Sequence, residues 1–227
     1  KIEKLFRCRS GSCADRGRGR WLTGSGDLHT NADGLSALRG PEDLLMDLVD
    51  RPDEIRKRLV EIHEVFTQVL QAHFDIVHPP SGGCNTSWMA ATCRGRYAVI
   101  QNDFSCMVSP AMFDEFFKNC VEEEAALADH SIYHLDGPGA LRHLASVCQS
   151  PHLDAVQWVP GDGKPPLHKW PDVLRNIQSL GKGLWLYGSP KDAETMMNYL
   201  KPEGCMYTIA CSSKEEARAV LKTAERI

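Results

Sequence analysis

The sequence predicts an α/β fold with a parallel β-sheet, of the kind that closes into a (β/α)8 (TIM) barrel. Two observations carry this prediction. In the second half of the 227-residue chain, short apolar runs alternate with longer amphipathic segments, the pattern of βαβ units. No glycine-rich nucleotide-binding motif follows any of the apolar runs, which disfavours a doubly wound nucleotide-binding sheet and favours a barrel.

Five segments are predicted to be strands of the sheet, because each is a short apolar run bounded by turn residues. They cover residues 97–101, 131–135, 155–159, 184–187 and 206–210. Helices are expected between and after them, over residues 110–129, 139–148, 171–180, 192–200 and 214–227. Right-handed crossovers would place the carboxyl ends of all five strands on one face of the molecule.

The first half of the chain carries weaker strand signals. Trp21–Gly24 and Asp75–His78 are predicted as short strands, with a polar loop through Asp33. Pro41 opens a short helix, and an amphipathic helix follows over residues 53–74. A closed barrel needs eight strands and about 250 residues, so we expect a barrel whose N-terminal strands are missing.

The composition suggests one folded domain preceded by a basic segment. The first 20 residues hold seven Lys or Arg and two Asp or Glu, so residues 1–28 are predicted to be a solvated, partly disordered leader. Residues 29–227 are then a single barrel domain. The net charge of −4 argues against a general nucleic-acid binder.

The nine cysteines indicate the redox state of the cellular compartment in which the protein is expected. Their number is odd, no CxxC pair is present, and neither a secretory signal nor an apolar run of about 18 residues is seen. Reduced thiols in the cytoplasm are therefore expected rather than a disulfide framework or a zinc ribbon. A membrane location is not expected.

The strongest candidate site is the stretch Tyr133–Gly139, which reads Tyr-His-Leu-Asp-Gly-Pro-Gly. His134 and Asp136 are two residues apart near the end of a predicted strand, so both side chains share one face. The carboxyl ends of strands are where α/β barrels place catalytic groups. Two structural alternatives stay open, in which His134 is a core histidine and Asp136 caps the next helix.

Two further residues follow predicted strands at the same edge. Asp103 comes just after the strand over residues 97–101, and Cys211 follows the last strand. Asp103 is a candidate for positioning substrate, with turn formation as its structural alternative. Lys164 lies in a Gly-Asp-Gly-Lys-Pro loop and is a weaker candidate for binding an anion.

From about His29 to its end, the chain resembles the C-terminal two-thirds of the uroporphyrinogen decarboxylase superfamily, which also contains zinc-dependent corrinoid (coenzyme M-type) methyltransferases. The resemblance rests on Gln101–Phe104, Val108–Phe113, Tyr133–Gly139 and Ala210–Ser213. The chain is most similar to an uncharacterised branch of that superfamily with the Tyr-His-Leu-Asp-Gly-Pro-Gly signature. The resemblance implies a TIM barrel and an enzyme.

The resemblance also implies a ligand set for a metal. Methyltransferases of this superfamily bind zinc through a His-x-Cys at a strand end and a distant Cys, and this chain has His134, Asp136 and Cys211 at the matching places. Zinc accepts imidazole, carboxylate and thiolate ligands. The exchange of Cys for Asp136 leaves open a different metal, or a metal-free site in which Asp136 orients His134 as a base.

The expected function is therefore a metal-assisted methyltransferase that activates a thiol acceptor, with a corrinoid protein as a partner that donates the methyl group. Asp103, His134 and Asp136 would be its catalytic residues. One alternative is a decarboxylase acting on a tetrapyrrole or another carboxylated substrate, with Asp103 at its centre. Another is a truncated, non-catalytic barrel. Because missing strands would expose sheet edges, a homo-oligomer is expected.

Overall fold

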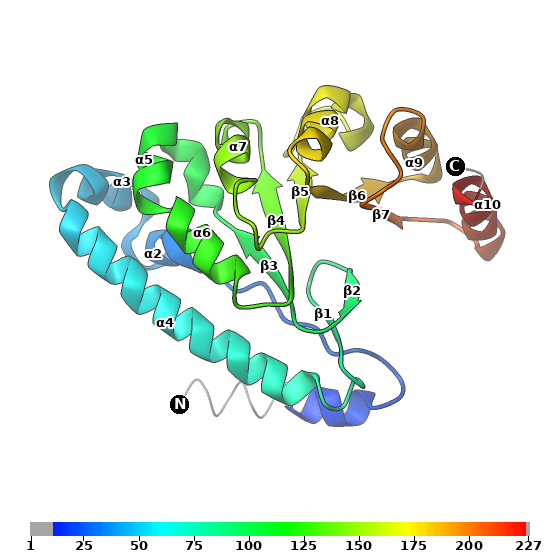
Figure 1. Cartoon of the computed structure of the whole chain (residues 1–227), viewed down its shortest axis with the longest axis horizontal. Coiled ribbons are helices and arrows are strands. Elements are labelled where there is room, and N and C mark those ends of the chain that lie inside the picture. The colour runs from blue at the N-terminus through cyan, green and yellow to red at the C-terminus, as the bar shows by residue number, and fades with distance from the viewer. Residues whose placement is uncertain (1–10, 226–227) are drawn as a thin grey trace.

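The computed structural model describes residues 11–225 and contains a five-stranded parallel sheet (Figure 1). The strands lie in sequence order, each hydrogen-bonded to the next. They are β3 (Tyr97–Gln101), β4 (His130–Asp136), β5 (Ala155–Val159), β6 (Gly183–Gly188) and β7 (Cys205–Ile209). The five strong strand predictions and the α/β class are therefore confirmed.

Closure into a barrel is not confirmed. Among the described residues β3 and β7 are the two edges of an open sheet. Two further strands, β1 (Cys84–Thr86) and β2 (Thr92–Arg94), pair only with each other as an antiparallel hairpin. No helix within residues 11–225 is long and apolar enough to cross a bilayer.

Helices follow each strand of the sheet, as predicted, with shorter bounds. The α-helices are α5 (Pro110–Phe116), α6 (Lys118–Ala125), α7 (Leu144–Val147), α8 (Pro171–Ser179), α9 (Pro190–Met197) and α10 (Lys214–Ala224). The described part of the chain also forms three short 3-10 helices, η1 (Asp103–Met107), η2 (Ala140–His143) and η3 (Leu167–Lys169). The segment expected to be one helix over residues 110–129 is divided at Phe117, whose side chain is fully buried.

Between residue 30 and the sheet the structure has three α-helices, which confirm the two predicted helices and correct the strand and loop predictions around them. They are α2 (Asn31–Arg39), α3 (Pro41–Asp50) and α4 (Pro52–Val77). The predicted strand Asp75–His78 is wrong. The buried side chains of Leu70, Phe74 and Val77 continue the helical spacing of four and three residues, so the apolar run extends α4.

The N-terminal segment also differs from its predictions. Trp21–Gly24 forms no strand, and beside it Ser25 makes only an isolated β-bridge with Ser87, outside the named strands. The polar loop expected through Asp33 ends earlier, because residues 31–33 form the first turn of α2. Of the basic leader predicted over residues 1–28, the part up to residue 10 lies outside the described residues, while residues 11–17 are helical.

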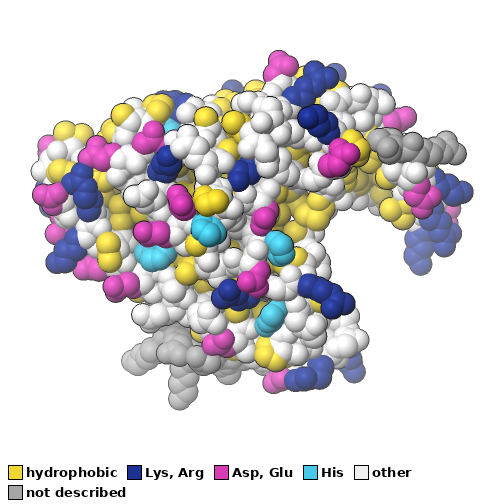
Figure 2. Space-filling model, in the orientation of Figure 1, with side chains coloured by type: hydrophobic (Ala, Val, Ile, Leu, Met, Phe, Trp, Pro, Cys, Tyr) yellow, Lys and Arg dark blue, Asp and Glu magenta, His cyan; other side chains and the backbone are white. Residues whose placement is uncertain are grey.

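The two faces of the sheet bury different side chains. Because side chains alternate along a strand, Tyr133, Leu135 and Trp158 point to the helices and join the main core. The opposite, inner face carries Ile132 and Trp185, which pack against residues of the β1–β2 segment. Figure 2 shows a hollow on the inner side near β6 and β7, with hydrophobic side chains along its wall.

A buried carboxyl group fixes α2 against the sheet. Glu124 in α6 is fully buried and accepts hydrogen bonds from the Thr30 hydroxyl (2.5 Å) and the Asn31 amide (3.0 Å). The Asn31 amide also donates to the carbonyl oxygen of Gln101 at the end of β3 (3.0 Å). Burial, the largest effect, raises the pKa of Glu124 to about 8.

We expect this raised pKa to make the protein less stable as pH rises. The unfolded carboxyl loses its proton near its ordinary pKa of 4.5, whereas the folded one keeps it to about 8. Between these values the folded state binds more protons, so the free energy of unfolding falls with rising pH, by up to about 1.4 kcal/mol per unit. Urea unfolding from pH 5 to pH 8 measures this slope.

The matched variant is Glu124→Gln, which mimics the protonated carboxyl: its amide can donate to the Thr30 oxygen while its carbonyl accepts from Asn31. The variant should show a flatter pH dependence and be more stable than the wild type at pH 8. An identical slope in the two proteins would contradict the assignment of this pH dependence to Glu124.

Candidate metal centre

Three side chains predicted from the sequence meet at the carboxyl edge of the sheet. His134 and Asp136 lie on the inner face of β4, and Asp103 begins η1 directly after the neighbouring strand β3. One donor atom from each, two carboxylate oxygens and a ring nitrogen, lie within 4.8 Å of one another. Two carboxylates and an imidazole so close together are a plausible ligand set for a divalent metal ion.

His134 is oriented by a residue on the adjacent strand. Its register partner Gln157 in β5 places its amide oxygen 2.5 Å from Nδ1 of His134. Because an amide oxygen only accepts hydrogen bonds, Nδ1 must carry the proton and donate it. Nε2 is then the nitrogen with a free lone pair, which is the arrangement that metal-bound histidines adopt. The ring of Trp88 packs edge-on against His134, with centroids 5.4 Å apart.

Asp103 is held in place through its backbone. The carboxylate of Asp33 in α2 accepts the N–H groups of Asp103 (2.9 Å) and Phe104 (2.8 Å), which start η1. The Asp103 side chain is exposed at the mouth of the site. Its pKa is raised by partial desolvation first and by the neighbouring charges of Asp33 and Asp136, against the opposing effect of His134.

Asp136 points into the site rather than capping a helix. The next helix, η2, has Gly139 at its N-cap and no side-chain cap, so the capping alternative for Asp136 is wrong. Its Oδ1 atom is buried and accepts no hydrogen bond from any described residue. A buried carboxylate oxygen without a partner is costly, and a bound cation would satisfy it.

Cys211 does not join this group. Among the described residues, the donors that converge with His134 and Asp136 include Asp103 and not Cys211. Cys211 follows β7, which is three strands away from β4. At about 4.8 Å between neighbouring strands, that separation is roughly 14 Å across a flat sheet. The expected His134–Asp136–Cys211 set is therefore corrected to Asp103, His134 and Asp136.

A cavity of about 350 Å³ extends from Asp136 along the edge of the sheet. Tyr187 and the loop after β5 line it, including Lys164, whose side chain is exposed. Its other lining residues are Val159, Pro160, Gly161, Asp162, Pro165, Pro166, Leu167, Gly188 and Asp192. The cavity is large enough for a small organic substrate that reaches Asp136, the one member of the three-residue group among its lining residues.

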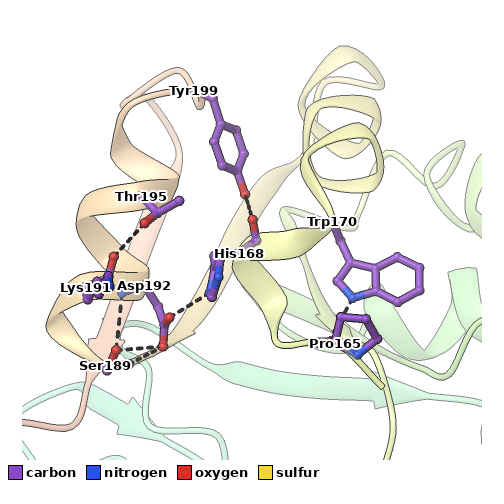
Figure 3. Close-up of polar contacts among 8 residues, drawn as sticks. All are labelled: Pro165, His168, Trp170, Ser189, Lys191, Asp192, Thr195 and Tyr199. Carbon is purple, nitrogen blue, oxygen red and sulfur yellow. Dashed lines mark hydrogen bonds and ion pairs between the residues drawn. The ribbon is translucent and has the colours of Figure 1, made fainter. Parts of the chain in front are cut away.

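The part of the cavity wall formed by Asp192 and the loop before η3 is held in place by hydrogen bonds and an ion pair (Figure 3). Asp192 pairs with Nδ1 of His168 (2.7 Å) and accepts from the backbone N–H of Ser189 (2.9 Å) in a capping box. The Trp170 indole donates to the carbonyl oxygen of Pro165 (3.0 Å). The end of the loop that lines the cavity is thus bonded to Trp170, just after η3, and η3 is joined to α9 through His168.

Sequence reasoning missed two residues that orient the site. Gln157 had a usable signal, because side chains alternate along the predicted strand 155–159 and only one of Gln157 and Trp158 can face inward. Asp33 had none, since its contact with η1 joins residues 70 positions apart. No protein-family model, curated protein or solved structure was found to match this chain. The resemblance therefore stays an expectation.

Proposed function

We propose that this chain is a metal-assisted enzyme in which Asp103, His134 and Asp136 hold a divalent cation. The observation that carries the proposal is the convergence of these three donors within 4.8 Å. The oriented lone pair of His134 and the unpartnered Oδ1 of Asp136 support it. Zinc ligands lie about 2.0–2.2 Å from the ion, so binding would draw the three side chains slightly closer together.

The reaction we propose is methyl transfer to a thiol, with zinc as the metal. A bound zinc ion would hold a substrate thiol as its thiolate, which is the nucleophilic form. The chain's own residues would bind the metal, leave a coordination position open, and place the rest of the substrate in the adjoining cavity. A corrinoid protein remains our proposed methyl donor, from the resemblance alone.

Decarboxylation of a tetrapyrrole or another carboxylated substrate is the second candidate, and one observation favours it. The pKa of Asp103 is raised by desolvation and by Asp33 and Asp136. A carboxyl that keeps its proton longer than usual can act as a general acid. In this reaction Asp103 would donate a proton to the carbon that loses the carboxylate, with no need for a metal.

The open edge of the sheet bears on assembly. No residue of β7 or α10 is fully buried, and β7 is an edge among the described strands. Unpaired N–H and C=O groups at such an edge favour pairing with another chain. These features support our proposal of a homo-oligomer, and they are equally compatible with a non-catalytic barrel that survives by self-association.

Metal content of the purified protein tests the proposal. We expect near-stoichiometric zinc, by elemental mass spectrometry, after growth and purification with zinc present. Asp136→Asn should lose most of it, because the amide is a weaker ligand with nearly the same shape. Cys211→Ala is the control and should retain the metal. If wild-type protein carries no metal and takes up none on dialysis against zinc, the proposed centre is wrong and the acid-catalysed alternative gains.

A further inference from the structure

A thiol that the metal set does not use lies one turn from Asp103. Cys106 belongs to η1, which spans Asp103–Met107. In a 3-10 helix there are three residues per turn, so side chains at positions i and i+3 eclipse each other. Cys106 therefore projects from the same side of η1 as Asp103. Its side chain is exposed, and no described residue holds the thiol in a hydrogen bond.

Cys106 also lies against the turn that follows Asp136. A Cβ atom built on Gly139 would stand 3.1 Å from Cβ of Cys106, closer than side chains normally approach. The missing side chain at Gly139 thus lets η1 come up to the end of β4. Partial desolvation raises the pKa of the Cys106 thiol first, and the charges of Asp103 and Asp136 raise it further. The sulfur is therefore within electrostatic reach of both carboxylates.

We propose that Cys106 supplies a fourth, thiolate ligand to the metal ion held by Asp103, His134 and Asp136. The inference rests on the proposed function, because it concerns the same centre. In the structure the sulfur is outside the group of donors that lie within 4.8 Å of one another. Rotation of the side chain from one staggered rotamer to another moves the sulfur by about 3 Å, and the exposed position of Cys106 leaves one side of it open to solvent.

The bound cation supplies the reason for the thiol to ionise. Carboxylates alone disfavour a thiolate, whereas a divalent ion reverses the local charge and releases the thiol proton to solvent. One sulfur, one nitrogen and two oxygen ligands suit zinc better than magnesium or calcium, which take oxygen ligands. Because zinc sites can expand to five ligands, a substrate donor can still bind.

Cobalt(II) substitution tests the inference, because a thiolate ligand gives Co(II) a near-ultraviolet charge-transfer absorption that oxygen and nitrogen ligands do not. We expect this absorption in the wild-type protein loaded with one equivalent of Co(II). Cys106→Ser should still bind Co(II) but lose the absorption, and Cys211→Ala should keep it. Cobalt content is measured on the same samples.

The outcomes separate this inference from the proposed function. Stoichiometric Co(II) without the absorption, or an absorption that survives in Cys106→Ser, overturns the role of Cys106 and leaves the three-ligand centre intact. No cobalt or zinc binding by the wild type overturns the centre itself. Alkylation of the wild-type protein with iodoacetamide gives a second readout, since zinc should protect Cys106 and leave exposed Cys13 reactive. Equal labelling of Cys106 with and without bound zinc counts against the proposal.

Discussion

Replacing His134 with alanine is expected to weaken metal binding by more than 100-fold. The residue supplies the nitrogen donor of the three-ligand group, and changing even an outer partner of a metal ligand typically costs 10–100-fold in affinity. Competition against a chelator of known zinc affinity measures the loss. The control is His130→Ala, which removes an exposed histidine from the opposite end of the same strand.

The partner of His134 sharpens this test. Gln157→Leu keeps the volume of the side chain but removes the oxygen that accepts from Nδ1. The ring then loses its fixed tautomer, so an intermediate loss of affinity is expected, of about 10–100-fold. If His134→Ala and His130→Ala bind zinc equally well, His134 is not a ligand. If His134→Ala weakens zinc binding but Gln157→Leu does not, the ring is held by its packing against Trp88 instead.

The second half of the fold could be predicted from the sequence for a simple physical reason. Strands of a sheet covered by helices read as short apolar runs, and their lengths separate them from the helices between them. The same argument failed at Asp75–His78, where a short apolar run is also what the end of a buried helix looks like. The openness of the sheet could not be predicted, because closure depends on strand tilt and stagger that no local pattern encodes.

Only part of the site was predicted correctly from the sequence, and there is a physical reason why some residues could be placed and others could not. His134 and Asp136 share a face because they are two apart in a strand, a rule that the sequence alone supplies. Asp103 was placed at the correct edge but given a different role, since the proximity of neighbouring strands is set by their order in the sheet. Cys211 was placed at that edge too, and the order of strands is what separates it from the centre.

The largest effect on stability is expected from Trp158, on the helix side of β5. Its side chain is completely buried and packs edge-on against Trp170, with ring centroids 5.5 Å apart. Trp158→Ala should lower the free energy of unfolding by about 3–5 kcal/mol, because the side chain leaves a cavity in a core that cannot fully collapse. Urea unfolding at fixed pH measures the change.

The matched control is Trp88→Ala, on the inner side near His134. This side chain is 39% exposed, so its removal should cost clearly less than that of Trp158. The two variants separate the two faces of the sheet, since the helix side carries the main core and the inner side carries the proposed chemistry. Trp88→Ala should therefore change the affinity for metal while changing the free energy of unfolding little. Trp158→Ala should lower the free energy of unfolding while changing the affinity for metal little. Equal losses of stability would mean that the inner face contributes to the core as strongly as the helix side does.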